Sequence, residues 1–255
     1  MDIFDVTVQR AADPERGGFL EAFSRDWAPV PNTLMGRDDA AKTFNAHFHL
    51  LEALDGLLAV APDRALRAHA QSLFDRLIGP ALNRADKTFL QFFDAEWRPL
   101  DAGGSNGHDI EASWLLPAIA GRIGADGDAS DGVAQAVLAR AVDADGGVVA
   151  GCDASGHHDR GKLWWVQAEA MVGLDAFERS GDPLFLDAVE RLWAFIKDVI
   201  VDPEAGEWRE RIEPAGDHRA GSWRAAHLWK CPYHNGRACL EVSKRAARLA
   251  RDKTG

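Results

Sequence analysis

Residues 13–21 read DPERGGFLE, and residues 202–210 read DPEAGEWRE. Two weaker echoes of this segment begin at Asp86 (DKTFLQFF) and at Asp143 (DADGGVV). Successive echoes begin 57 to 73 residues apart, about the length of one helix pair with its loop, and such a recurrence is typical of repeats. The spacing therefore predicts helix pairs that are joined at one end by short, β-like loops.

Helical periodicity of the apolar residues fills the intervals between the echoes. Residues 40–59 and 64–78 are predicted to form one pair, separated by Pro62 and Asp63, which stop the first helix and cap the second. The remaining predicted helices cover 108–123 with 130–142, 163–179 with 183–199, and a last helix at about 236–251. About seven helices can thus be identified.

Repeated helix pairs with loops at one end predict an all-α toroid, in which inner helices line a pocket and the loops form its rim. A plain α-solenoid is the alternative. Trp27, Trp97 and Trp208 lie in or near the loop segments and favour the closed form with a pocket. We expect one domain over residues 1–255, a length that can bury a sizeable core.

The composition argues against several classes of protein. A net charge of −11 without a run of Lys and Arg disfavours nucleic acid and anionic membranes as partners. Apolar runs stay below the roughly 20 residues of a membrane span, and the first residues do not resemble a secretory signal. The three cysteines show no framework of spacings and indicate reduced thiols, so we expect a cytoplasmic protein.

Residues 45–52 (NAHFHLLE) place polar side chains inside a predicted helix. Asn45 and His49 are four residues apart and share a face, whereas His47 points elsewhere. The HxH pattern is therefore a poor pair of metal ligands. One of the two histidines can simply be a hydrogen-bonded residue of the core.

Residues 107–114 (GHDIEASW) follow a Gly-rich turn, so His108 is expected at the exposed start of a helix. Glu111 lies three residues on, on the same face, and Trp114 follows after one more turn. A carboxylate beside an imidazole fixes its tautomer and raises its basicity, which suits proton transfer near neutral pH. The alternative is that Glu111 only caps the first turn.

Two further segments combine aromatic and polar residues. In residues 229–237 (WKCPYHNGR), Pro232 keeps Cys231 out of the helical conformation, so His234 is expected just before a helix, with Arg237 one turn later. Residues 164–169 (WWVQAE) add two adjacent indoles and a carboxylate. Indole faces stack on the C–H faces of sugar rings, while Arg, Glu and Asn bind hydroxyl groups.

Metal and serine chemistry are weaker alternatives. A zinc site could be assembled from Cys152, Cys231, His234 and the pair His157 and His158, but neither a CxxC nor an HExxH spacing supports it. A serine nucleophile is a weaker alternative still. We therefore predict no metal site.

Four stretches together resemble the signature motifs of the N-acylglucosamine 2-epimerase and cellobiose 2-epimerase family, in the family's order. The KCPYHNGR form of the fourth is most similar to the cellobiose 2-epimerase branch. The four stretches are Asn45-x-His-x-His49-Leu-Leu-Glu-Ala, Gly-His108-Asp-Ile-Glu-Ala-Ser-Trp, Lys-x-Trp-Trp165-x-Gln-Ala-Glu169 and Lys-x-Pro-Tyr-His234-Asn-x-Arg237.

The resemblance implies an (α/α)6 barrel that epimerises a reducing mono- or disaccharide at C2, without a cofactor. One histidine removes the C2 proton of the ring-opened aldose to give a cis-enediolate, and a second returns a proton to the opposite face. By motif, His108 and His234 are the acid/base pair and His49 is a third essential imidazole. The implied substrate-binding residues are Asn45, Glu111, Trp114, Trp165, Glu169, Trp229 and Arg237, where Glu111 also supports His108, Arg237 contacts substrate oxygens and the three tryptophans pack on sugar faces.

The resemblance also implies a difference, because family members are considerably longer and the amino-terminal part of their barrel has no counterpart here. We expect an incomplete toroid whose open edge exposes apolar surface, which a homodimer could cover. Two alternatives to the epimerase remain. One is an aldose–ketose isomerase of the same superfamily, and the other is a truncated sugar-binding pseudoenzyme without turnover.

Overall fold

The computed structural model describes residues 3–33, 37–100, 104–152, 158–173, 176, 180–214 and 224–252. Two compact units are formed, and the helix α4 (Asn106–Ile123) contributes to both. The first unit takes its described residues from 1–104 and 115–131, and the second from 105–114, 132–153 and 157–255. The expectation of one domain stays a prediction. None of the helices in the described ranges has the length and apolar character that a membrane crossing requires.

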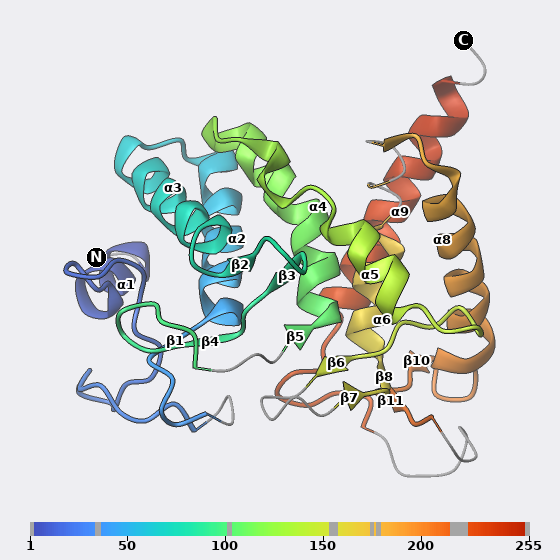
Figure 1. Cartoon of the computed structure of the whole chain (residues 1–255), viewed down its shortest axis with the longest axis horizontal. Helices are drawn as coiled ribbons and strands as arrows, with labels where there is room; N and C mark the ends of the chain where they lie inside the picture. The colour runs from blue at the N-terminus through green and yellow to red at the C-terminus, as the bar shows by residue number, and fades with distance from the viewer. Residues whose placement is uncertain are drawn as a thin grey trace. The chain divides into compact units, whose positions relative to one another are not determined.

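In the first unit, helices α2 (Phe44–Val60) and α3 (Arg64–Ile78) form an antiparallel pair, and short strands lie in the loops (Figure 1). Strand β1 pairs antiparallel with β4, and β2 pairs antiparallel with β3, with Leu82 opposite Phe89. The elements are α1 (Ile3–Ala11), β1 (Lys42–Thr43), α2 (Phe44–Val60), α3 (Arg64–Ile78), β2 (Leu82–Asn83), β3 (Thr88–Phe89), β4 (Phe92–Phe93) and a 3-10 turn at Gly127–Ser130.

In the second unit, helices α6 and α9 pack together and α8 packs on α6 (Figure 1). Strand order is β5-β6-β7 in one small sheet, while β8 pairs with β11 and β9 with β10. The elements are β5 (Gly104–Ser105), α5 (Val133–Ala141), β6 (Gly151–Cys152), β7 (His158–Asp159), β8 (Lys162–Leu163), α6 (Trp164–Met171), α8 (Pro183–Phe195), a π-helical turn (Ile196–Ile200), β9 (Val201–Asp202), β10 (Glu207–Trp208), β11 (Arg211–Ile212) and α9 (Tyr233–Asp252).

The predicted helices are present, with some changes at their ends. The bounds of α3 are those predicted, and the Asp63 carboxylate caps it by accepting the backbone N–H of Leu66 at 2.9 Å. The sequence pattern missed α1. The predicted continuous helix 163–179 is wrong, because α6 ends at Met171 and Val172 and Gly173 form a turn; part of the remainder lies outside the described residues.

The prediction that His234 precedes a helix is wrong, because α9 begins at Tyr233 and His234 lies in its first turn. The carbonyl of Pro232 accepts the N–H of Gly236 at 2.9 Å, as expected of the residue that caps a helix. Proline is compatible with the start of a helix because its fixed φ is suitable and no N–H is needed there. The proline therefore starts the helix rather than delaying it.

The two strongest echoes in the sequence form the same turn. The Asp13 carboxylate accepts the backbone N–H groups two and three residues later at 3.2 and 3.0 Å, and the Asp202 carboxylate does so at 3.0 and 3.1 Å. Each turn closes through a glycine N–H, of Gly17 or Gly206, that donates to the aspartate carbonyl at 2.8 Å. Both glycines have positive φ, 74° and 65°, a conformation that glycine adopts without steric cost.

The echo that was predicted to begin at Asp86 is displaced from its predicted register. Asn83, not Asp86, accepts the N–H groups two and three residues later, at 3.1 and 3.4 Å. Lys87 then takes the place of the glycine, with a φ of 55°. The alignment on Asp86 was wrong because an asparagine side chain caps this turn as an aspartate does, and the match of letters hid the equivalence.

A lysine stands just before each of three helices and is buried there. Lys42, ahead of α2, is fully buried, and its ammonium group donates to the Asp13 carboxylate at 2.9 Å and to the carbonyls of Gly17 and Ala95 at 2.8 and 2.7 Å. Burial lowers the pKa of Lys42, and the hydrogen bond to Asp13 opposes this shift. The ammonium also lies 5.3 Å from the ring centroid of Trp97.

The same arrangement recurs twice in the second unit. Ahead of α6, Lys162 contacts the carboxylates of Asp145 and Asp143 at 2.5 and 3.1 Å. Ahead of α9, the buried Lys230 donates to the carbonyl of Ala225 at 2.8 Å and lies 3.4 Å from the Glu207 carboxylate. Each lysine thus fixes the start of a helix to a loop.

We expect Lys42→Met to lower the free energy of unfolding by about 3–5 kcal/mol, the usual cost of removing one partner of a buried ion pair. Methionine preserves much of the side-chain volume but leaves the Asp13 carboxylate without its cation. Urea denaturation followed by circular dichroism measures the loss. The matched control is Lys244→Met, because Lys244 forms an exposed pair with Glu241 and its loss should cost less than about 1 kcal/mol. Equal losses in the two variants would contradict the argument from burial.

Acid is expected to destabilise the loops. The N–H of Ala205 is the largest cause that lowers the pKa of Asp202, and burial opposes it less strongly. At Asp13 burial raises the pKa, but the Lys42 hydrogen bond and the backbone N–H groups outweigh it, so that this pKa is lowered as well. Since the unfolded pKa is about 3.9, these carboxylates stabilise the fold above about pH 4, and the contribution is lost as pH falls through the lower folded values.

Thermal melts between pH 7 and pH 2.5 check this expectation. The melting temperature of the parent should fall steeply once the pH drops below about 4. Asp202→Asn should melt lower than the parent at pH 7 and lose less on acidification, because its turn no longer contains the titrating carboxylate. If both proteins lose the same number of degrees, the carboxylate at position 202 does not contribute to acid stability.

Candidate functional site

The first turns of α4 carry two of the predicted site residues on one face. The His108 side chain is half-buried. The backbone N–H of His108 donates to the hydroxyl oxygen of Ser105 at 3.2 Å, so that Ser105 caps the helix. Glu111 is completely buried, and one of its carboxylate oxygens accepts a short hydrogen bond from Arg237. The predicted contact between His108 and Glu111 stays a prediction.

The start of α4 is held by a residue of α5 that the sequence analysis missed. Arg140 donates to the Asn106 side chain at 2.9 Å and to the buried Asp109 carboxylate at 2.5 Å. A bidentate guanidinium that bridges two side chains on one helical turn fixes both its position and its rotation. Because His108 and Glu111 lie on the same turns of α4, their orientation is fixed with that of the helix.

Helix α6 contributes Trp165 and Glu169, four residues apart. Gln167, between them, is fully buried and forms two hydrogen bonds with the backbone of Val148, both 2.8 Å long. The two bonds imitate a strand pair and tie α6 to the loop that precedes β6. The carboxylate of Glu169 is therefore delivered by a helix whose first two turns are anchored.

The His234 imidazole on α9 meets Glu169 directly. Its Nδ1 lies 2.7 Å from Glu169 Oε1, and the same oxygen accepts a hydrogen bond from Arg237 at 2.8 Å. The other oxygen, Oε2, accepts the indole N–H of Trp114 at 3.3 Å. Both oxygens of this fully buried carboxylate are thus engaged.

The two predicted acid/base histidines contact one indole ring. The centroid of the Trp165 ring is 5.1 Å from that of His108 and 5.4 Å from that of His234. A Cβ on Gly107 would collide with this ring, so the glycine of the GHDIE motif permits the close approach of the indole. His108 and His234 are hence neighbours within the second unit.

The hydrogen bonds define the chemistry available to His234. Glu169, as a carboxylate, only accepts, so Nδ1 carries a hydrogen and Nε2 is the nitrogen that can take up or release a proton. A carboxylate in this position also stabilises the imidazolium that forms when Nε2 is protonated. We refer to His108, Glu111, Trp165, Glu169, His234 and Arg237 as the histidine cluster.

Two predicted sugar-stacking tryptophans occupy different surroundings. Trp114 is buried, and the guanidinium groups of Arg237 and Arg245 lie 5.0 and 5.8 Å from its ring centroid. Trp229 is 49% exposed, in the segment before α9. Packing of either ring against a sugar stays a prediction.

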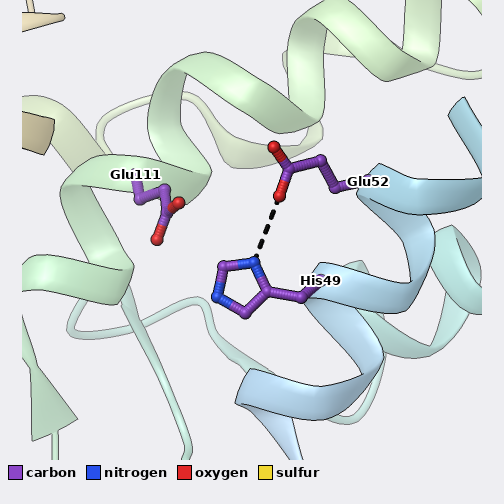
Figure 2. Close-up of side chains that lie close together, drawn as sticks. All are labelled: His49, Glu52 and Glu111. Atoms are coloured by element: carbon purple, nitrogen blue, oxygen red, sulfur yellow. Dashed lines mark hydrogen bonds and ion pairs between the residues drawn. The ribbon is translucent and has the colours of Figure 1, made fainter. Parts of the chain in front are cut away.

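The α2 segment lies in the first unit. His47 is the satisfied core histidine that was anticipated, because its Nε2 accepts the N–H of Phe19 at 2.9 Å and its Nδ1 lies 2.7 Å from the carbonyl of Thr43. Figure 2 shows His49 turned toward Glu52, whose carboxylate is 3.1 Å from its Nδ1. Asn45 is half-buried on the same helix. That His49 and Asn45 share a pocket with His108 and His234 stays a prediction.

Potential metal ligands occur within the histidine cluster. One ligand atom each from Glu111, Glu169 and His234 lies within 4.8 Å of the others. The Arg237 guanidinium donates to both carboxylates, so that a cation of the protein already pairs with them. Of the residues in the zinc alternative, Cys152 and His158 lie together, with Sγ 3.2 Å from Nδ1, but among the described residues neither belongs to a group of three potential ligands. His157 lies outside the described ranges, and the absence of a zinc site stays a prediction.

Sequence reasoning assigned no role to Arg140 and Gln167, which hold α4 and α6, or to Tyr233, which contacts Arg237 within α9. The phenol oxygen of Tyr233 accepts a hydrogen bond from Arg237 at 2.8 Å. Tyr233 could have been found, because it is four residues before Arg237 and therefore on its face of the helix. Arg140 carried no such signal, since its partners are more than thirty residues away in the sequence.

Comparison with known proteins relates this geometry to a family. The family model of N-acylglucosamine 2-epimerase matches residues 1–234. The cellobiose 2-epimerase of Dictyoglomus turgidum is 33% identical over 238 residues, which are 89% of this chain and 60% of that protein. The D-mannose isomerase of Pseudomonas cannabina pv. alisalensis is 26% identical over 260 residues, covering 90% of this chain and 60% of that protein.

A solved structure shows the same fold. The cellobiose 2-epimerase from Bacillus thermoamylovorans B4167 matches with a TM-score of 0.87 at 31% identity, over 95% of this chain and 64% of that one. The predicted fold class is confirmed, because these neighbours are (α/α)6 barrels. The chain spans less than two thirds of the length of these relatives. On the family match and the shared fold, this chain belongs to the N-acylglucosamine 2-epimerase family.

Proposed function

We propose that the chain epimerises a reducing sugar at C2 through two histidines, without a cofactor. The observation that carries this proposal is the pair of imidazoles, His108 and His234, on one indole ring, with His234 oriented by a buried carboxylate. The candidate substrates are of the cellobiose, mannose and N-acylglucosamine type. Cellobiose 2-epimerases among the relatives support this substrate class.

The chemistry requires a base on one face of C2 and an acid on the other. In the ring-opened aldose, one imidazole takes the C2 proton as the C2–H bond breaks. The electron pair of that bond then forms the cis-enediolate. The second imidazole then gives its proton to the opposite face of C2, and the aldehyde re-forms with inverted C2. Each turnover puts one proton onto one histidine and takes one off the other, so proton exchange with solvent resets both before the next turnover in the same direction.

The enediolate carries negative charge that must be stabilised before it reprotonates. The cluster offers imidazole N–H groups for this task, and His49 is the proposed third imidazole, which would polarise O1 or assist ring opening. Trp165, half-buried between the two histidines, offers an apolar face for the sugar C–H groups. Asn45 and Trp229 are proposed to contact the more distant hydroxyls and ring.

The runner-up is an aldose–ketose isomerase, which forms the same enediolate but protonates C1. The similarity to a D-mannose isomerase supports this second candidate. A sugar-binding chain without turnover is the third candidate. We place the activity in the cytoplasm, which the free thiols of Cys152, Cys231 and Cys239 support.

Incubation with cellobiose, lactose, mannose and N-acetylglucosamine in D2O, followed by NMR, distinguishes the three. We expect deuterium at C2 of an epimer. Deuterium at C1 of a ketose would identify the isomerase. Binding without incorporation of deuterium would show that turnover is absent and would overturn the proposal.

His234→Asn is expected to lower C2 exchange by roughly 10²–10⁴-fold, the usual effect of removing a general acid or base. An asparagine amide can still donate to Glu169 from a position near that of Nδ1, but it has no group in place of Nε2. This choice matters because the imidazole is largely buried against Glu169, so truncation to alanine would also affect stability.

The matched control is His227→Gln, on the same segment. His227 pairs with Glu210 at 2.9 Å and lies against Trp164, not Trp165. Deuterium exchange and melting temperature are measured on the same samples. If His234→Asn exchanges as fast as His227→Gln while both remain folded, His234 is not a catalytic residue.

A further inference from the structure

The Arg237 guanidinium is held in place by hydrogen bonds and ring contacts with other side chains of the protein. One terminal nitrogen, Nη2, donates to the carboxylates of both Glu111 and Glu169, and the other, Nη1, donates to Tyr233 at 2.8 Å. The carbon of the guanidinium lies 4.4 Å from the centroid of the Tyr233 ring and 5.0 Å from that of Trp114. A group held in this way is suited to orient its neighbours.

Tyr233 reaches the catalytic histidine as well. Its ring meets the His234 ring edge-on, with the centroids 4.6 Å apart and the planes at 71°. Tyr233 and Arg237 are four residues apart on the first turns of α9, and therefore share a face. One residue thus contacts both the guanidinium and the imidazole that use the same carboxylate.

The charges of two buried carboxylates explain why the contacts of Arg237 matter. Glu111 and Glu169 are both fully buried, and an ionised carboxylate in that position is costly unless a cation and hydrogen bonds compensate it. Arg237 donates to both. Without the guanidinium, two nearby carboxylates would be expected to share a proton, as like charges in one site do. A proton on Glu169 would weaken its role as the acceptor for His234 Nδ1.

We propose that Arg237 and Tyr233 are positioning residues, which keep Glu169 an acceptor and thereby hold His234 in the tautomer with Nδ1 protonated. This inference rests on the proposed function. It assigns Arg237 a role through Glu169, in place of the sugar contact that the family resemblance implied. Tyr233 fixes the guanidinium in its plane and the imidazole in its orientation.

The test compares Arg237→Met, Arg237→Lys and Tyr233→Phe with the parent by two readouts. The first is the tautomer of His234, from the ¹⁵N shifts of its ring nitrogens at neutral or slightly alkaline pH. The parent should show a protonated Nδ1. Arg237→Met should shift the population toward protonated Nε2, and Arg237→Lys, which keeps the charge, should largely restore the parent spectrum.

The second readout is the division of the activity loss between kcat and KM in C2 exchange. We expect Arg237→Met to lower kcat by at least tenfold while KM for the sugar changes less than about threefold. Tyr233→Phe removes one hydrogen bond and keeps both ring contacts, so its kcat should fall by about threefold to tenfold. Arg245→Met is the control, since Arg245 lies on the same helix, also faces Trp114, and donates to the carbonyl of Val172.

Each outcome decides the question. A KM that rises tenfold or more in Arg237→Met, with kcat and tautomer unchanged, would identify a sugar contact and overturn the proposal. An unchanged tautomer in folded Arg237→Met would overturn it as well. If Arg237→Met fails to fold, Tyr233→Phe and Arg237→Lys decide by the same readouts. If the parent shows no exchange with any sugar, the proposed function fails, whereas the tautomer experiment still tests the positioning role.

Discussion

The buried ammonium group of a lysine just before a helix is the interaction on which the rest of the structure depends. Lys42, Lys162 and Lys230 each satisfy carbonyl or carboxylate oxygens of a loop that would otherwise lose water without replacement. Each lysine also sets where its helix starts. Because α6 and α9 begin next to Lys162 and Lys230, the positions of Trp165 and His234 follow from these contacts.

Much of the fold could be predicted from the sequence because local signals agreed with the tertiary structure. Asp63 and Pro62 mark the break between α2 and α3, and the structure places the cap at this aspartate. Prediction failed where one residue type substitutes for another. Asn83 caps its turn as Asp13 does, and Lys87 adopts the positive φ that Gly17 and Gly206 adopt in their turns, so that the alignment on Asp86 is three residues too late.

The candidate site was predictable as a set of residues but not as a network. Motif spacing brought His108, Glu169 and His234 to attention, and the structure places all three in one unit. The pairing of Arg237 with Glu111, 126 positions away, has no local signature, because helix packing and not sequence spacing brings the two together. Sequence spacing could suggest only a nearby partner for Glu111, namely His108, and the sugar contact of Arg237 came from the family resemblance.

The order of the cluster along the chain has a consequence for biosynthesis. Glu111 and Glu169 leave the ribosome well before Arg237, which reaches them only when α9 has formed. Until then the nascent second unit contains two carboxylates that are destined for burial but have no cation. Their desolvation is unfavourable at that stage, so the helices α4 and α6 should dock late, and a ribosome that stalls before residue 237 would present them open to chaperones and proteases.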